Sequence, residues 1–325
     1  MKDFTRQIAR WKKGARLTSL SDEFERLASG VSGIPSVDEV LPDLHLFNNN
    51  IDILQFYRTY RKYSGKFNLH FLSSIPYILE EECRLGSALL RYLLQQKNTS
   101  GQTAKLQTIG NAEGVIARTI TRLGNGEVST LTNSPTLANM HEFDSKRVDN
   151  CFFHNGPFFE ITRDRLKNSK TLNHFSNGFD VIYEDTTFQM YDTNREDQIA
   201  FAVQNLKSNG LFICLEKCNH DDIDEYLKRE DQKDLKFKTR FYSETQLKEK
   251  QKTIVKPMQF GQVTLPRLHR AIKGSLRHTK LIWNSCNFYI IAASNEIKQL
   301  ESFLELLGPA CITSEFEYES IPANE

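Results

Sequence analysis

The segment TIGNAEGVIARTI, residues 108–120, combines a small-residue turn with the start of an expected helix. A strand is expected to end at Ile109, and the turn at 110–114 leads from it into the helix. Glycine lets the backbone turn tightly and lets a ligand approach it closely. Because a helix N-terminus presents unpaired N–H groups and a partial positive charge, such a turn suits a carboxylate or a phosphate.

The spacing of the glycines discriminates between kinds of cofactor. A dinucleotide-binding turn requires the pattern G-x-G-x-x-G. Here Ala112 and Gly114 follow Gly110, which gives G-x-A-x-G, and no glycine fits the later phosphate position, where Val115 stands. The spacing therefore argues against a dinucleotide site more strongly than it establishes a different one.

Strand-like and helical patterns alternate from Lys105 onward, which predicts a parallel sheet with helices on both faces. The strand-like runs are 105–109, 127–131, 150–154, 179–184 and 210–217, and the helical pieces are 114–123, 135–146, 162–175 and 195–208. Two further runs, 280–284 and 287–294, are joined by a tight link and predict an antiparallel hairpin at one edge. A helix at 296–307 is expected to follow.

In this register the chain resembles the class I S-adenosylmethionine-dependent methyltransferases, of the small-molecule type. The turn at 110–114 resembles the E/D-x-G-x-G-x-G turn that wraps the methionine portion of the cofactor in that family. The segments EVSTLTNSPT (127–136), FFHNGPFF (152–159), FDVIYEDTTFQMY (179–191) and LKSNGLFICLEK (206–217) resemble its second to fifth strands and the turns after them. The resemblance covers about 105–308 and implies an α/β, Rossmann-like sheet of seven mostly parallel strands.

The resemblance also implies a cofactor, S-adenosylmethionine, and residues that would act on it. Asp185 would face the cofactor and the acceptor, and Glu184 and Tyr57 are further catalytic candidates. Met190 and Tyr191 would lie where the acceptor pocket opens. The expected cofactor-binding residues are Gly110, Asn111, Ala112, Gly114, Thr132, Asn133, Gly156, Phe158 and Asp185.

Several of these candidates also have a purely structural interpretation. Phe158 is favoured as a core residue over an adenine shelf, and packing is favoured for Tyr57. Glu113 is interpreted as an exposed residue of the first helical turn, which the helix dipole favours. His154 is the one histidine placed near the expected site.

Acids that the family carries are replaced in this chain. Thr108 stands at the start of the first motif, Thr132 with Asn133 at the ribose position, and Gly156-Pro157 after the third strand. Neutral side chains of this kind can still hydrogen-bond a ribose. The expected activity is methyl transfer to a small-molecule or peptide acceptor by direct in-line displacement. A non-catalytic binding or scaffold protein of the same fold stays open as an alternative.

A second alternative is an RNA- or protein-modifying methyltransferase. The basic segment 1–16 and the lysine- and arginine-rich stretch within 228–280 suggest it, although acids interleave those lysines as on a solvated helix face. The apolar residues of 1–16 are at helical spacing and favour packing on the chain's own domain. A net charge of +1 and the absence of an NPPY-type motif argue against DNA as a partner.

Composition and segment texture set the remaining expectations. The 325 residues are 39% hydrophobic and 26% charged, without an apolar run of membrane-spanning length or a secretory signal, so a cytoplasmic location is expected. Six scattered cysteines form no metal-binding pattern, and no metal is expected.

We expect an N-terminal helical cap at 1–103, ending in a polar linker at 97–103, and a cofactor-binding domain at 104–325. Within that domain, 218–277 should form a helical cover over the sheet edge. The oligomeric state is left open.

Overall fold

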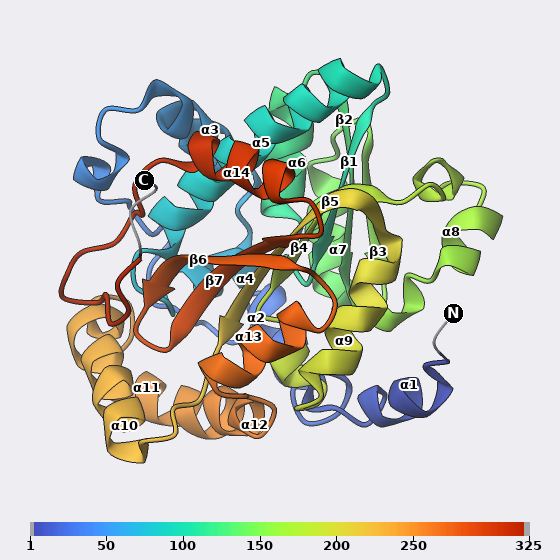
Figure 1. Ribbon diagram of the computed structural model, residues 1–325. Helices are drawn as coiled ribbons and strands as arrows, with labels where there is room; N and C mark the ends of the chain where they lie inside the picture. Colours follow the sequence, from blue (N-terminus) through green and yellow to red (C-terminus); the bar gives the residue numbers. More distant parts are fainter. Residues whose placement is uncertain (1–2, 322–325) are drawn as a thin grey trace.

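The computed structural model describes residues 3–321 and centres on one seven-stranded sheet in the order β3-β2-β1-β4-β5-β7-β6 (Figure 1). Neighbouring strands pair in parallel except β7, which is antiparallel to both β5 and β6. The Rossmann-like α/β sheet with its antiparallel edge hairpin is confirmed. The strands are β1 (Ala104–Ile109), β2 (Val128–Ser134), β3 (Cys151–Asn155), β4 (Phe179–Asp185), β5 (Leu206–Lys217), β6 (His278–Ser285) and β7 (Phe288–Ser294).

Two hydrophobic clusters pack the helices against opposite faces of the sheet. On one face lie α3 (Ile51–Tyr63), α5 (Ile78–Ser100), α6 (Val115–Leu123) and α14 (Ile297–Leu307). On the other lie α1 (Thr5–Trp11), α8 (Arg163–Asn168), α9 (Arg195–Ala202) and α13 (Leu265–Lys273). The sheet is therefore covered on both sides, which agrees with the burial of its parallel strands on both faces.

The region before β1 differs in part from its expected outline. Helix α4 (Lys66–Leu72) precedes one long helix, α5. The expected linker at 97–103 is wrong, because α5 continues to Ser100 and ends at Gly101, whose φ of 70° suits glycine. Helix α5 packs in the same core as the strands although it precedes residue 104, so the division into two domains stays a prediction.

The basic N-terminal helix α1 packs on the chain's own core, as favoured from its spacing. Trp11 is fully buried, and its ring centroid lies 5.2 Å from that of Phe158 and 5.7 Å from that of Phe201. This aromatic cluster packs α1 against the segments that follow β3 and β4.

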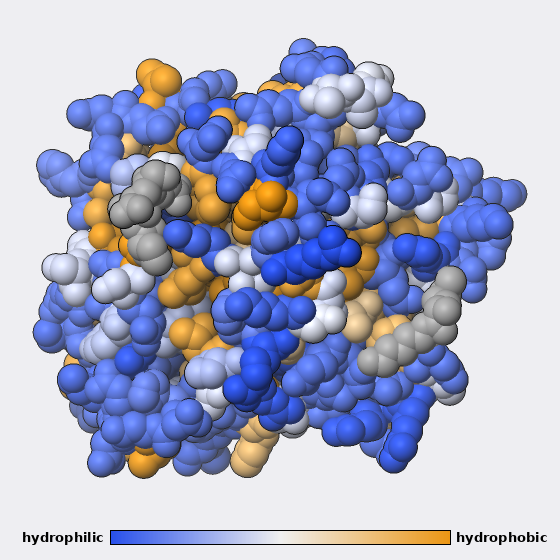
Figure 2. Space-filling view, viewed as in Figure 1, coloured by the Kyte–Doolittle hydropathy of each residue, from blue (hydrophilic) through white to orange (hydrophobic). Residues whose placement is uncertain are grey.

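The segment 218–277 is mostly helical and lies at the carboxyl edge of the sheet, lower left in Figure 1. A capping box starts α11: the Ser243 hydroxyl accepts from the backbone N–H of Gln246, and Oε1 of Gln246 accepts from the backbone N–H of Ser243. On the face seen in Figure 2 its outer surface is largely hydrophilic. Its elements are α10 (Ile223–Gln232), the π-helical turn η7 (Lys233–Phe237), η8 (Lys238–Arg240), α11 (Glu244–Lys250), the π-helical turn η9 (Gln251–Val255), α12 (Lys256–Gln259) and α13.

The remaining helices connect these layers. They are α2 (Ser21–Ala28), α7 (Leu137–Ser145) and the short 3-10 helices η1 (Ala15–Leu17), η2 (Leu44–Phe47), η3 (Phe158–Glu160), η4 (Asn173–Phe175), η5 (Phe188–Met190) and η6 (Val203–Asn205). Over residues 3–321, no helix has both the length and the apolar character needed to span a bilayer.

Candidate active site

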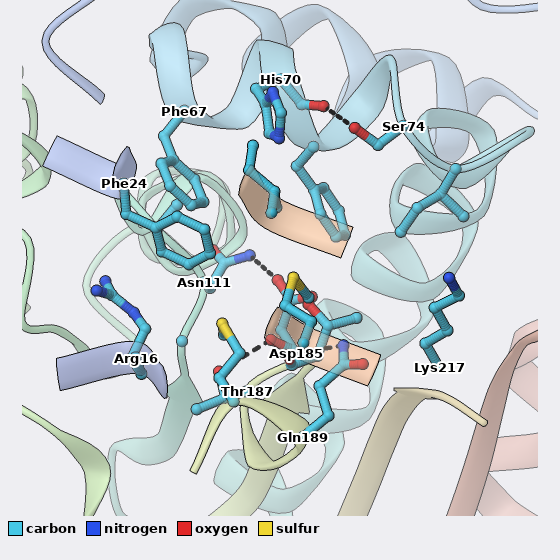
Figure 3. A pocket seen from close by; sticks show the side chains of 18 of the residues that line it. Arg16, Phe24, Phe67, His70, Ser74, Asn111, Asp185, Thr187, Gln189 and Lys217 are labelled. Carbon is cyan, nitrogen blue, oxygen red and sulfur yellow. Dashed lines mark hydrogen bonds between the residues drawn. The ribbon is translucent and has the colours of Figure 1, made fainter. Parts of the chain in front are cut away.

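A cavity lies at the carboxyl ends of the parallel strands, where open α/β sheets bind ligands (Figure 3). It encloses about 1080 Å³ of space that no atom fills, part of it open to solvent. The ends of β1, β2, β4 and β5 form its floor, while α2, α4 and the 218–277 segment form its walls. The predicted residues that line it are Gly110, Asn111, Ala112, Asn133, Asp185, Met190 and Tyr191.

Asn111 links the first strand turn to the end of β4. Its Nδ2 donates to Oδ2 of Asp185 at 2.9 Å, and its Oδ1 accepts from the backbone N–H of Ile116 at 3.1 Å. Burial raises the pKa of Asp185 to about 7, and the hydrogen bond from Asn111 opposes that rise. A carboxyl group with a pKa near neutral can accept a proton from a reacting group at physiological pH.

Gly110 is required by a packing contact as well as by its turn. Its φ is 82°, and a Cβ there would lie 1.5 Å from Oγ1 of Thr187. The Thr187 hydroxyl reaches the carbonyl oxygens of Ile109 and Asp185 at 3.3 and 3.0 Å. The loop after β4 therefore closes directly on the turn after β1 and fixes their relative position.

Three residues that line the cavity carry a buried side-chain amide oxygen with no protein partner among the described residues. These oxygens are Oδ1 of Asn133, Oδ1 of Asn139 and Oε1 of Gln189. The amide nitrogen of Asn133 donates to the carbonyl of Gly156 at 3.1 Å, and that of Gln189 to the carbonyl of Thr186 at 3.3 Å. The amide oxygens of both side chains are therefore acceptors that lack a donor. A ligand bearing hydroxyl or ammonium groups could supply that donor.

Arg16 places a positive charge at one end of the cavity and was not anticipated from sequence. Its guanidinium is buried, donates to Oγ1 of Thr136 and lies 4.7 Å from the ring centroid of Phe24. Burial lowers the pKa of Arg16 to about 10, so the group stays charged at neutral pH. In Figure 3, Arg16, Phe24 and Phe67 lie on one side of Asp185 and Lys217 on the other.

The opposite end of the cavity carries a cluster of buried lysines, which we call the lysine cluster. Its members are Lys217, Lys233, Lys238 and Lys250, each 4% exposed or less. The interpretation of this stretch as a solvated helix face is wrong for Lys238 and Lys250. It holds for Lys248, whose side chain is 76% exposed.

Glu184 does not line the cavity. It is fully buried on the other side of β4 from Asp185, and its Oε1 accepts from the backbone N–H groups of Thr187 and Phe188. Successive residues of a strand point to opposite faces, so only one of the two acids can face the ligand space. Glu184 holds the loop that follows β4.

Tyr57, Thr132 and Gly114 also lie outside the cavity lining. Tyr57 is on α3 and packs beside Phe47, with ring centroids 6.1 Å apart. Gly114 has a φ of 71°, and a Cβ there would lie 2.8 Å from Cγ2 of Thr132. Gly114 and Thr132 therefore support the turn by packing closely against each other.

The remaining candidates after β3 are spread around the site. Gly156 does not line the cavity; its carbonyl accepts from Asn133 and its backbone N–H donates to the carbonyl of Ser134. Phe158 is 1% exposed within the aromatic cluster around Trp11. His154 pairs with Glu160, with Nε2 and Oε2 3.0 Å apart.

Glu113 corrects an expectation, because it is 1% exposed instead of solvated. Its Oε1 accepts from the backbone N–H groups of Phe67 and Asn68, at 2.9 and 3.0 Å. It thereby caps the N-terminus of α4 and holds that helix against the turn, where Phe67 and His70 reach the cavity.

Comparison with known proteins finds no match in sequence and only weak similarity to solved structures. No family model matches the sequence, and no curated protein matches it either. Among solved structures, the plantazolicin methyltransferase BpumL, in complex with a monoazolic desmethylPZN analog and S-adenosylhomocysteine, covers 85% of this chain and 97% of its own, at 10% identity and a TM-score of 0.46. An O-methyltransferase family protein from Burkholderia thailandensis covers 67% of this chain and 60% of its own, at 10% identity and a TM-score of 0.38. Similarity at this level carries no argument about activity.

Proposed function

We propose that the protein is an S-adenosylmethionine-dependent methyltransferase that acts on a small-molecule or peptide acceptor. One observation carries the proposal: the turn after β1, the end of β2 and the end of β4 converge on one cavity, where buried amide oxygens lack protein partners. The sheet has the seven mostly parallel strands and the antiparallel edge hairpin that the sequence predicted.

The residues present fit this cofactor. Asn133 stands at the end of β2, where its unpartnered oxygen can accept from a ribose hydroxyl although the usual acid is missing. Gly110, Asn111 and Ala112 form the turn toward which the methionine portion would lie. Gln189 offers a second unpartnered acceptor, suited to an ammonium group.

The chemistry requires little from the protein beyond position and a proton acceptor. The cofactor supplies an electrophilic methyl group on a sulfonium sulfur. Asp185, held by Asn111, would take the proton that the acceptor nucleophile releases. The buried walls, Phe24, Phe67 and Met190 among them, would exclude water and align the two reactants.

The alternative of an RNA-modifying enzyme receives less support from the placement of the basic residues. Lys238 and Lys250 are buried in the cavity, and exposed Lys236 and Lys248 are paired with Glu315 and Glu244. A cytoplasmic location and the absence of a DNA partner stay predictions.

Isothermal titration calorimetry with S-adenosylmethionine and S-adenosylhomocysteine tests the proposal. We expect both to bind at one site per chain and expect Asn133→Leu to weaken binding at least about tenfold, through loss of an acceptor in a buried site. Asn98→Leu is the matched control, because Asn98 is exposed near the end of α5. Failure of the wild-type protein to bind either compound would refute the proposal.

A further inference from the structure

The lysine cluster is a second built feature of the cavity. Its four lysines come from four elements: Lys217 ends β5, Lys233 begins η7, Lys238 begins η8 and Lys250 ends α11. Lysine is rarely buried unless it is paired. The cluster therefore needs counter-charges, and the described residues supply only some of them.

Two carboxylates lie within the lysine cluster. Oε2 of Glu230 lies 2.7 Å from Nζ of Lys217 and 2.6 Å from Nζ of Lys233. Oδ1 of Asp234 lies 2.7 Å from Nζ of Lys238 and 3.6 Å from that of Lys233. Four ammonium groups face two carboxylates, which leaves an excess of two positive charges when all are ionised.

Among residues 3–321, the hydrogen-bond partners of Lys250 are neutral hydroxyl groups. Its Nζ donates to the hydroxyls of Ser74 and Tyr242, the latter at 3.1 Å, and lies 4.4 Å from the Tyr242 ring centroid. His70 lies beside Tyr242, with Nδ1 3.4 Å from its hydroxyl oxygen. Hydroxyl and ammonium donors thus gather on one wall of the cavity without a matching anion.

We propose that the lysine cluster binds a phosphate group of the methyl acceptor, so that the acceptor is a phosphomonoester whose dianion replaces the missing counter-charge. The inference rests on the proposed function for the identity of the reaction, but the anion site itself does not depend on it. A phosphomonoester carries a charge close to −2 above pH 7 and has three acceptor oxygens, which matches the excess charge and the surrounding donors.

Proton binding gives this site a distinctive signature. Burial lowers the pKa of Lys217 to about 7 and that of Lys238 to about 8. Burial, together with the neighbouring lysines, lowers the pKa of Lys250 well below its usual value. Arrival of a dianion favours the charged lysines, so phosphate binding must draw in protons. The other titratable groups facing the cluster are Glu230, Asp234, His70, Tyr226, Tyr242 and Cys286.

Calorimetric titration of the full chain with inorganic phosphate at pH 8, in buffers of different ionisation enthalpy, tests the proposal. Phosphate is already a dianion at that pH, so the expected net proton uptake comes from the protein. Lys250→Met and Lys238→Met should each weaken phosphate binding at least about tenfold, the loss expected for a charged hydrogen-bond donor. Lys248→Met should leave it unchanged, since that lysine is exposed two residues from Lys250.

Two further probes define the chemical class. Phenyl phosphate should compete with inorganic phosphate, because the cavity continues from the cluster toward Asp185. Succinate should bind more weakly, since its carboxylates are spread apart. The proposal would be overturned if succinate bound more tightly than phosphate or if phenyl phosphate did not bind. It would also be overturned if Lys250→Met and Lys238→Met bound phosphate as tightly as Lys248→Met does.

The wild-type measurement stands even if a variant does not fold. Absence of phosphate binding, or binding without proton uptake, overturns the inference. Titration with S-adenosylhomocysteine separates it from the proposed function: phosphate binding without cofactor binding refutes the methyltransferase and keeps the anion site. Cofactor binding without phosphate binding refutes the anion site and keeps the methyltransferase.

Discussion

Nδ2 of Asn111 donates to Oδ2 of Asp185 across 2.9 Å and joins the turn after β1 to the end of β4. The bond orients the carboxylate at the centre of the cavity and favours its ionised form. A group that both faces the ligands and titrates near neutrality suits the acceptor of a proton. The proposed chemistry depends on this pair.

Replacing Asp185 by asparagine should lower kcat by about 100-fold or more, the contribution expected of a positioned general base. The side chain keeps its size and can still pair with Asn111, so S-adenosylhomocysteine affinity should change little. Steady-state kinetics with the identified acceptor, alongside calorimetry, measures both. Asp164→Asn, an exposed change on α8, is the control. An unchanged kcat would remove Asp185 from the mechanism.

The pH profile of kcat/KM should rise through about pH 7 and fall at higher pH. The rise follows deprotonation of Asp185, whose pKa is about 7. The fall follows deprotonation of Lys217 and Lys238, which weakens binding of an anionic acceptor. Asn111→Ala removes a bond that lowers the pKa of Asp185, so the acid limb should move to higher pH. A limb that stays in place contradicts this assignment.

Gly114 and Gly126 offer a matched pair for testing the turn. Both have positive φ, 71° and 88°, but a Cβ at Gly114 would meet Thr132 at 2.8 Å, whereas one at Gly126 meets nothing within 4 Å. Gly126→Ala should cost about 1–2 kcal/mol from backbone conformation alone. Gly114→Ala should cost about 1–3 kcal/mol more through overpacking. Urea unfolding measures the free energy of unfolding, and equal losses would show that the clash is relieved without cost.

Lys250→Met should raise the free energy of unfolding by about 1 kcal/mol or more in phosphate-free buffer, because it removes a buried amine that has no carboxylate partner. The wild-type protein should also become more stable from pH 7 to pH 9. In that window the unfolded lysines bind protons that Lys217, with its folded pKa of about 7, has released. The slope of the free energy of unfolding against pH should be smaller in the Lys250→Met variant. A flat wild-type pH dependence would count against buried lysines with lowered pKa values in the folded state.

Local patterns in the sequence were enough to predict the sheet. The strand runs ending near Ile109, Asp185 and Lys217 were placed within a few residues, because each is a strand-like run that contains apolar residues and alternates with helical patterns. Asn111, Asn133 and Asp185 were expected as site residues because the family resemblance places them near the ends of such runs. Their contacts with each other depend on strand order, which no local pattern specifies.

The lysine cluster could not be found in this way. Lys233 and Lys238 are five residues apart and share a side only because η7 is a π-helical turn, in which the N–H of Lys238 bonds to the carbonyl of Lys233. Exposed Lys236 lies between them, so that the sequence pattern of this stretch resembles that of a solvent-exposed helix face. Arg16 was missed for a similar reason, since its burial depends on contacts with Thr136 and Ser134, more than a hundred residues away.

The most direct test of the central claim is a crystal structure of the protein with S-adenosylhomocysteine. We predict that the ligand lies across the turn at Gly110–Ala112, with a ribose hydroxyl about 2.7–3.2 Å from Oδ1 of Asn133 and the sulfur on the side of Asp185. Density for the ligand outside this cavity, or a ribose turned away from Asn133, would contradict the account.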